Sequence, residues 1–392
     1  MALVSCYLRI NLPIKFTLLL TLRNINVYNY ILVLCFFSYF EHVKSEGEKS
    51  QVEALHEEFT TYESDEEIEV TDEDGSSMTI RAHPGMDIET DARHGWRKNA
   101  KDTSVVALGC NTHKVVRHEH VTRADDRVAQ RHELIGTKRI YGFIEDQGYT
   151  VNIHVHDRNM SINKWIRENT NSTNQNDTWH GVKSLKIGLN GPKGICSGPR
   201  YKHGKTWHKE LHDKLEPLCT HAHWSIRNSN GDSQVLRDSL VNAVEHYKGN
   251  HAKCSINARC QNDPQYDPST VLIESQVAEK LLREKLTGSI IYKHAEDFRY
   301  GKDTYHTESF NNTVNMFQDK RIAFGDMQYS LRSYLAVLHW NENVGREYTS
   351  IHNPPDPNAP RSKKGKKRLV ACSFNYRNSI WRSYMDSVFT VN

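Results

Sequence analysis

The chain has 392 residues, which is enough for two or three domains and a large hydrophobic core. Charged residues make up 25% of it and the mean hydropathy is -0.70, which excludes a membrane protein with several spans and allows at most one short membrane element. The formal net charge of +3 is small but unevenly distributed, and eight scattered cysteines are too few for a disulfide-stapled domain.

Residues 1–45 form an apolar segment whose role the sequence leaves open. Its longest apolar run, residues 30–40, is too short to cross the ~30 Å hydrocarbon core of a bilayer as a helix. Extending the span back to residue 16 would bury Arg23 and three asparagines, which is costly in lipid. No small-residue cleavage site follows the run. We therefore expect no membrane span, and an anchor through residues 16–40 stays the alternative.

An acidic block follows, and we expect it to be a disordered tail over residues 46–77. Residues 52–75 hold eleven Asp or Glu residues and no Lys or Arg. Such a density of like charges disfavours a packed structure.

A basic run, "RSKKGKKR", lies in a Pro-rich and basic C-terminal tail over residues 351–392. This run suits a nuclear import signal, a phosphate contact or a plain solvated segment.

Between these ends, the apolar pattern predicts an α/β fold. In chain order we expect a strand region at 78–93, a two-stranded hairpin at 102–110 and 113–123, a helix at 127–148, a strand at 149–159 and a short helix at 161–169. This order predicts a sheet with an antiparallel half and a crossover to a later strand. We divide the remainder into a core first part at 78–190, a helical insertion at 191–300 and further core helices at 301–350.

The segment 305–317, "YHTESFNNTVNMF", has the periodicity of an amphipathic helix. Phe310, Val314 and Phe317 recur at helical spacing and form an apolar stripe. The opposite face carries Glu308 and three asparagines. Acids are common on the solvated face of a helix, so the segment alone does not distinguish a solvated Glu308 from a functional one.

Two other carboxylates occupy positions where functional groups gather in α/β sheets, at the ends of strands. Asp91 lies at the end of the first expected strand region and Asp157 at the end of the fourth. Together with Glu308 they could converge on divalent cations, because carboxylates held close repel one another unless a cation neutralises them. Hard oxygen ligands suit Mg²⁺ or Mn²⁺, and a pair of such ions promotes attack on a phosphodiester.

The residues around these acids carry a resemblance to a known family. The stretches are "TDARHGWRKNA", "HVHDRNMSINK", "NDTWHGVKSL" and "HTESFNNTVNMFQDKRIAF". They resemble the DDE-type catalytic domain of eukaryotic DNA transposases of the Mutator-like and related superfamilies. The resemblance covers residues 86–350, and the separations of 66 and 151 residues between the three acids are similar to the spacing in that family.

The resemblance implies a ribonuclease H-like mixed sheet flanked by helices, with a mostly helical insertion before the last catalytic helix. It implies that Asp91, Asp157 and Glu308 are catalytic and bind two Mg²⁺ or Mn²⁺ ions. The activity would be DNA strand cleavage and strand transfer in the nucleus, by a homo-oligomer acting on transposon ends and target DNA. A D-x-x-H motif of the family corresponds to Asp177 and His180, which we expect to support the site or contact DNA rather than bind the ions directly. Candidate DNA-binding residues are Arg93, Arg97, Lys98, Lys183, Asn311 and Asn312.

The chain departs from the family pattern before Asp91. A transposase of this kind usually carries a separate DNA-binding domain there, often a zinc-binding module, and no Cys/His set precedes Asp91 in this sequence. The alternative to an active enzyme is therefore a catalytically inactive or host-adopted DNA-binding remnant.

A second cluster of metal-binding residue types lies in the insertion. His246, His251, Cys254 and Cys260 follow the pattern H-x4-H-x2-C-x5-C. Two imidazoles and two thiolates complete a tetrahedral zinc set, and a zinc ion here would be structural. The spacing is not that of a standard zinc finger. Two surface histidines and two free thiols are the other interpretation.

Overall fold

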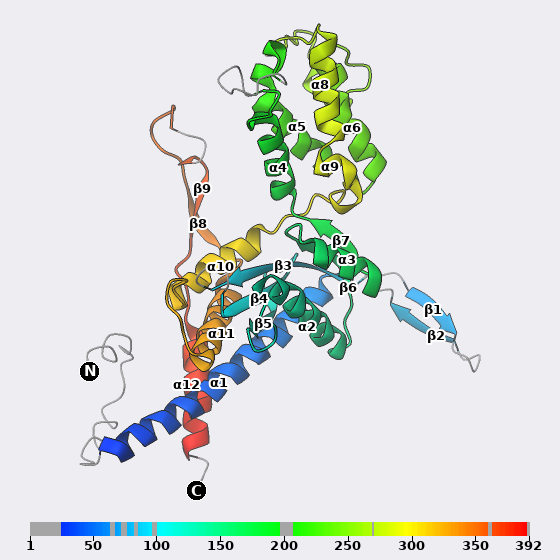
Figure 1. Ribbon diagram of the computed structural model, residues 1–392. Coiled ribbons are helices and arrows are strands. Elements are labelled where there is room, and N and C mark those ends of the chain that lie inside the picture. Colours follow the sequence, from blue (N-terminus) through cyan, green and yellow to red (C-terminus); the bar gives the residue numbers. More distant parts are fainter. Residues whose placement is uncertain are drawn as a thin grey trace.

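A mixed five-stranded sheet forms the centre of the protein (Figure 1). The computed structural model describes residues 25–62, 67–71, 77–81, 85–95, 100–196, 207–268, 270–359 and 363–389. The sheet contains β3 (Met86–His94), β4 (Asp102–Gly109), β5 (Val115–Thr122), β6 (Val151–His156) and β7 (Thr173–Asn176), in the spatial order β5-β4-β3-β6-β7. The β3–β4 and β4–β5 pairs are antiparallel, whereas β6 runs parallel to both β3 and β7. The predicted hairpin and crossover are thus confirmed.

Strand β7 was not predicted, because its sequence "TNQN" lacks the β-branched and aromatic residues typical of strands. Asn174, Gln175 and Asn176 are nevertheless buried. The Asn174 side-chain amide donates to the Asp297 carboxylate at 3.0 Å, and the Gln175 amide donates to the backbone carbonyl of Glu296 at 2.8 Å. These partners are more than a hundred residues away, so no local pattern could indicate the strand.

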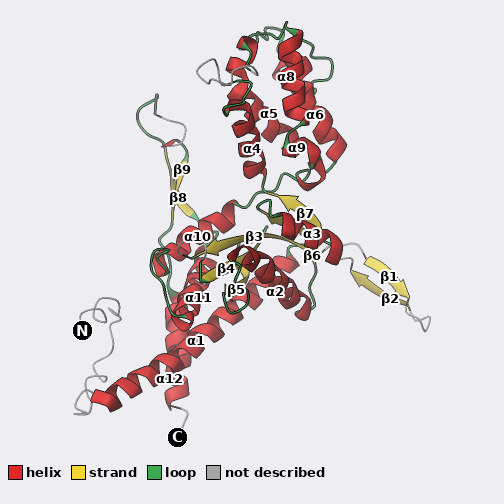
Figure 2. Ribbon diagram, in the orientation of Figure 1, coloured by secondary structure: helices red, strands yellow, loops and turns green. Residues whose placement is uncertain are grey.

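Helices cover both faces of the sheet (Figure 2). One face packs against α2 (His132–Asp146), and the other packs against α10 (Tyr305–Phe317) and α11 (Asp326–Asn343). β4 shows the division clearly, since Val105 contributes to the core beneath α2 and Val106 contributes to the core beneath α10 and α11. The short helix α3 (Met160–Asn169) follows β6, as predicted. The predicted elements of the core are therefore present, except that the strand region expected at 78–93 is divided between β2 (Ser77–Arg81), which belongs to a separate two-stranded sheet, and β3.

The long helix α1 (Ile25–Thr60) differs from the expected disordered acidic tail over 46–77, because residues 46–60 are helical. Gln51, Ala54, Leu55 and Glu58 recur at helical spacing and are buried. The Glu58 carboxylate accepts hydrogen bonds from the backbone N–H groups of the β4–β5 turn, at 2.9 and 2.7 Å. An acid in this block therefore has a packed structural role, which composition could not reveal.

The part of the chain that the structure describes contains no helix that is both long and apolar enough to cross a bilayer. Within the alternative anchor at 16–40, residues 16–24 lie outside the described residues. Helix α1 packs against β5, α11 and α12 (Asn375–Phe389). Val43, Leu338 and Ile380 form a small core among α1, α11 and α12. The C-terminal segment 351–392 therefore includes a packed helix as well as its Pro-rich and basic stretch.

Two small hairpins lie outside this core. They are formed by β1 (Glu67–Thr71) with β2 (Ser77–Arg81), and by β8 (Tyr348–His352) with β9 (Lys366–Leu369). Figure 1 shows each of them projecting from the sheet and its helices. The basic side chains of β9 are exposed.

A helical lobe stands above the sheet and agrees with the predicted insertion (Figure 1). It contains α4 (Thr178–Asn190), α5 (Leu215–Arg227), α6 (Ser233–Tyr247), α7 (Arg259–Asn262), α8 (Gln276–Thr287) and α9 (Ile290–Lys293). Val182, Leu185 and Leu189 of α4 belong to the same hydrophobic core as the other lobe helices. The lobe therefore begins with α4, near residue 178, rather than at residue 191. Chain order then returns to the sheet through α10, so the ends of the lobe meet at one edge of the sheet.

Candidate active site and metal-ligand clusters

Strand register brings three aspartates to one edge of the sheet. His156 is paired with Thr90 on β3 and with Asn176 on β7. Each of these three paired residues is followed directly by an aspartate: Asp91, Asp157 and Asp177. Because β6 runs parallel to both β3 and β7, this register places Asp91, within β3, next to Asp157 and Asp177, which directly follow the carboxyl ends of β6 and β7.

Asp177 is fixed by hydrogen bonds at the start of α4. One carboxylate oxygen accepts from the backbone N–H of His180 at 2.6 Å, the arrangement of a helix N-cap. The other accepts from the backbone N–H and from the hydroxyl of Thr304, both at 2.8 Å. The D-x-x-H motif thus has a local physical basis, since the cap turns the third residue after Asp177 back toward the carboxylate.

The His180 ring completes what we call the acidic cluster, made of Asp157, Asp177 and His180. The His180 Nδ1 atom lies 3.1 Å from an oxygen of Asp157 and 3.1 Å from an oxygen of Asp177. It is buried, and neither contact has the alignment of a hydrogen bond. One ligand atom from each of the three residues lies within 4.8 Å of the others. This convergence of two oxygens and a nitrogen on one point fits a shared cation better than an ordinary hydrogen-bonded pair.

Asp91 is tied to α10 rather than to the acidic cluster directly. One of its oxygens accepts from the Asn311 side-chain amide at 2.7 Å, and the other accepts from the backbone N–H of Ala92 at 2.7 Å. Asn311 therefore positions a candidate catalytic carboxylate, in addition to the predicted role at DNA.

Carboxylate crowding shows in the electrostatics of the edge. Burial, opposed by the charge of His180 and aided by the charges of Asp91, Asp177 and Glu308, raises the pKa of Asp157 to about 6. Burial likewise raises the pKa of Glu133 to about 7, with contributions from Asp91 and Asp157. Burial and the proximity of other carboxylates therefore disfavour the ionised forms of Asp157 and Glu133. A cation bound beside them would lower their pKa values again.

Glu308 lies on the face of α10 predicted from the sequence. Phe310 and Val314 are buried against the sheet, whereas Glu308 is exposed. It lines a pocket of about 260 Å³ together with Asp177 and Trp179. Glu308 thus borders the acidic cluster from the α10 side, close enough to influence the pKa of Asp157.

The predicted DNA contacts occupy different environments. Arg93 is buried, and its guanidinium donates to the backbone carbonyl of Gln318 at 2.8 Å, so it is used inside the fold. Arg97 and Lys98 lie outside the described residues. Lys183 is exposed, with its ammonium 4.3 Å from the centre of the Trp179 ring. Asn312 is exposed on α10.

Two groups near this edge were missed by the sequence reasoning. Glu133 begins α2, and its carboxylate accepts from the side-chain amide of Asn159 at 2.8 Å. Arg227 ends α5 and lines the same pocket as Glu308. Neither has a local signal, because each reaches the edge only through the packing of its helix.

The second predicted cluster is also assembled. His246, His251, Cys254 and Cys260, which we call the lobe cluster, each offer a ligand atom, and these four atoms lie within 4.8 Å of one another. All four residues are half-buried. They lie in the helical lobe, apart from the acidic cluster in the chain.

Comparison with known proteins adds no family. No protein-family model matches the chain, and no curated protein matches it.

Proposed function

We propose that the chain is a divalent-metal-dependent enzyme that cleaves and transfers DNA strands, of the DDE transposase type. The observation that supports this most directly is the set of three register-aligned aspartates, with the His180 Nδ1 atom 3.1 Å from carboxylate oxygens of two of them. Acidic side chains are often clustered without a function, but here strand pairing sets the positions of the aspartates, and hydrogen bonds fix the carboxylates of Asp91 and Asp177.

The sheet supports the proposal through its connectivity. Numbering the five strands along the chain, the spatial order is third, second, first, fourth, fifth, which is compatible with a ribonuclease H-like fold. Asp91 lies on the first of these strands, Asp157 follows the fourth, and Glu308 lies on a helix after the helical lobe. This is the arrangement that the family resemblance implies for the three catalytic acids.

Asp157, with Asp177 and His180 beside it, would hold one Mg²⁺ or Mn²⁺ ion, and Asp91 and Glu308 would contribute the further carboxylates of a two-ion site. When bound, such ions lower the pKa of an attacking water or 3′-hydroxyl and neutralise charge on the leaving oxygen. The chain's own contribution is positioning: Asn311 orients Asp91, and Thr304 orients Asp177. In the cleavage step, the water oxygen joins the phosphorus as the bond to the 3′-oxygen breaks.

Exposed groups beside the cluster suit a nucleic-acid strand. Trp179 is exposed and can stack on a base, and the Lys183 ammonium next to it can contact a phosphate. Lys320 is exposed, and its charge opposes the raised pKa of Asp91, so it lies near the carboxylates from another side. Action on chromosomal DNA would place the protein in the nucleus.

The test is cleavage of supercoiled plasmid DNA by the purified full chain in Mg²⁺ or Mn²⁺. We expect metal-dependent nicking that the substitution Asp157→Asn lowers by at least about 100-fold, because losing a ligand removes activation of both oxygens. Asp146→Asn is the matched control, since Asp146 is an exposed acid at the other end of α2 from Glu133.

Two results would contradict the proposal in different ways. Salt-sensitive DNA binding without any metal-dependent cleavage would indicate the DNA-binding remnant instead. Cleavage that Asp157→Asn leaves near the wild-type rate would move the active site away from this edge of the sheet.

A further inference from the structure

The lobe cluster is built by a sharp turn at the end of α6. His246 lies in the last turn of this helix, and Gly249 follows with a φ of 81°, a left-handed conformation that favours glycine. The backbone N–H of Asn250 donates to the carbonyl of Glu245 at 3.0 Å, and that of Gly249 donates to His246 at 3.0 Å. These two bonds form a Schellman motif, which reverses the chain and returns His251 toward the helix end.

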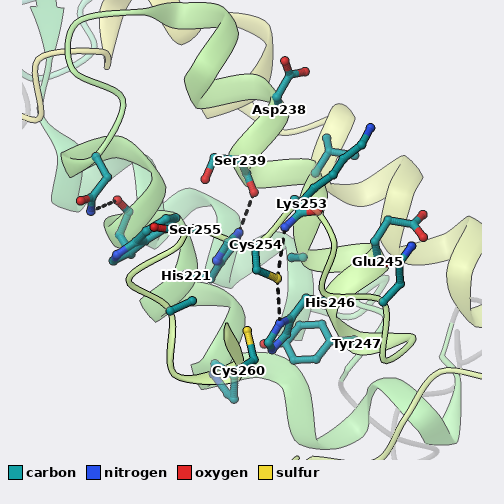
Figure 3. A pocket seen from close by; sticks show the side chains of 18 of the residues that line it. His221, Asp238, Ser239, Glu245, His246, Tyr247, Lys253, Cys254, Ser255 and Cys260 are labelled. Carbon is teal, nitrogen blue, oxygen red and sulfur yellow. Dashed lines mark hydrogen bonds between the residues drawn. The ribbon is translucent and has the colours of Figure 1, made fainter. Parts of the chain in front are cut away.

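The remaining ligands follow within ten residues. The backbone N–H of Cys254 donates to the carbonyl of His251 at 2.9 Å, closing another turn, and Cys260 lies on the short helix α7. In Figure 3 the Cys254 sulfur points toward the His246 ring, and the Cys260 sulfur lies beside that ring. Three separate turns thus direct four side chains to one place.

The spacing of three of the ligand atoms matches a tetrahedral zinc site, and the Cys260 sulfur lies within 4.8 Å of each of them. For Zn–N bonds of about 2.05 Å and Zn–S bonds of about 2.3 Å, tetrahedral angles require N···N, N···S and S···S separations of roughly 3.3, 3.6 and 3.8 Å. The two Nδ1 atoms of His246 and His251 are 3.1 Å apart. The Cys254 sulfur lies 3.4 Å from the first of them and 3.8 Å from the second.

The outer contacts of the cluster also suit a metal. The Asn242 side-chain amide lies 3.6 Å from the Cys254 sulfur, where its N–H donates to a thiolate. The Nε2 atom of His246, on the far side of the ring from the cluster, lies 3.4 Å from the Tyr266 hydroxyl. Partners of this kind orient metal-bound imidazoles and stabilise metal-bound thiolates. The ion also has an entry path, because His246, Cys254 and Cys260 line an open pocket of about 1490 Å³ between α5 and α6 (Figure 3).

From this geometry we infer that the lobe cluster binds one structural Zn²⁺ ion through His246, His251, Cys254 and Cys260. Four protein ligands leave no open coordination position, so the ion has no direct part in chemistry. Its role is to tie the loop between α6 and α8 to the end of α6. This inference is independent of DNA cleavage, because a zinc-stapled lobe would exist in an inactive remnant as well.

The experiment measures metal content in the full chain, purified without chelators and dialysed. We expect about one zinc per chain in the wild type and in Cys372→Ser, a half-buried cysteine outside the cluster. We expect almost none in the double variant Cys254→Ser, Cys260→Ser. Cobalt substitution of the wild-type chain provides a readout that does not depend on whether the variant folds, because tetrahedral Co²⁺ with thiolate ligands has characteristic visible absorption bands.

Three outcomes would overturn the inference. These are a wild-type chain without stoichiometric zinc, zinc retained in the double variant, and a cobalt spectrum without tetrahedral thiolate bands. A Cys254–Cys260 disulfide in the wild type purified under reducing conditions would also contradict it, since a disulfide removes both thiolate ligands.

Discussion

The acidic cluster offers two carboxylates and one imidazole, whereas the lobe cluster offers two imidazoles and two thiols. The first set is hard, incomplete and bordered by a pocket, which suits Mg²⁺ or Mn²⁺ with room for a substrate. The second set is soft and already four-coordinate, which suits Zn²⁺ with no room for one. The type of ligand atom and the number of open coordination positions, rather than the presence of a cluster alone, therefore distinguish a catalytic metal site from a structural one.

Protonation separates the two clusters as well. Burial and neighbouring carboxylates raise the pKa of Asp157 to about 6, so this group is mostly ionised at neutral pH and ready for a cation. Burial and the neighbouring Cys260 raise the pKa of Cys254 to about 11, so zinc must displace a proton from this thiol.

Stripping zinc from the lobe should give the largest effect on stability. If the free zinc concentration is a thousand times the Kd of the site, removing the zinc lowers the free energy of unfolding by about 4 kcal/mol, which is roughly a thousandfold in the folding equilibrium constant. We expect faster hydrogen exchange in α6 and α8 after treatment with a zinc chelator, and unchanged Mn²⁺ binding at the acidic cluster. Exchange that increases equally in the sheet would mean that zinc does not act on the lobe in particular.

The substitution Glu308→Gln should separate catalysis from folding. It removes a charge beside the acidic cluster but leaves the buried stripe of Phe310 and Val314 intact, and Gln has a similar helix propensity. We expect thermal stability to change by well under ~1 kcal/mol while metal-dependent DNA cleavage falls by at least about 100-fold.

Combining Glu308→Gln with Asp157→Asn provides the control for this prediction. The double variant should be little worse than either single variant, because the acids act as a unit. A Glu308→Gln chain that cleaves near the wild-type rate would show that Glu308 is an ordinary solvated acid.

Proton competition should weaken Mn²⁺ binding at the acidic cluster in acid. The raised pKa means that the folded chain holds a proton on Asp157 below about pH 6, and that the metal must displace it. Mn²⁺ affinity should therefore rise as pH increases, by about tenfold between pH 5 and 7 for one competing proton. Without metal, the same raised pKa makes the free energy of unfolding fall as pH rises. Between about pH 4 and 6 the folded state holds more protons on Asp157 than the unfolded state does, so the contribution of this group to stability is lost over that range.

Calorimetric titration with Mn²⁺ at several pH values checks this dependence. An affinity that stays constant between pH 5 and 7 would contradict the proposed site at Asp157.

Glu133→Gln should have the smallest effect. The new side chain can still accept the hydrogen bond from Asn159, but the negative charge near Asp157 is lost. We expect the midpoint of the Mn²⁺ pH profile to move to lower pH by less than about one unit, and cleavage to stay within roughly tenfold of the wild type. A loss of cleavage as large as that in Asp157→Asn would instead make Glu133 a metal ligand.

Much of the candidate site could be predicted because its signals are local. Asp91 lies within a recognisable strand and Asp157 directly follows another, and the apolar stripe of α10 fixes which face carries Glu308. In the D-x-x-H motif, His180 is the third residue after Asp177. An N-cap residue and the third residue after it are close together in any helix, so this pairing is visible in the sequence. The lobe cluster could likewise be recognised in the sequence, because its first and last members are only fourteen positions apart.

Other features depend on tertiary packing, and the sequence could not show them. Glu133 reaches the carboxylates only because α2 crosses the sheet, and β7 pairs although its residues are polar. Residues 46–60 looked solvated because their acids are interleaved with the buried positions of α1. Arg93 looked like a phosphate contact, yet its guanidinium is bound by a carbonyl 225 residues away.

Mn²⁺ titration of three chains tests whether the two clusters bind different metals for different purposes. The chains are the wild type, Asp157→Asn and the double variant Cys254→Ser, Cys260→Ser, and the zinc content of each is determined. We expect Mn²⁺ binding to disappear in Asp157→Asn, which keeps its zinc, and to persist in the double variant, which has lost its zinc. Equal Mn²⁺ affinity in the wild type and Asp157→Asn would contradict the proposed division between the two clusters.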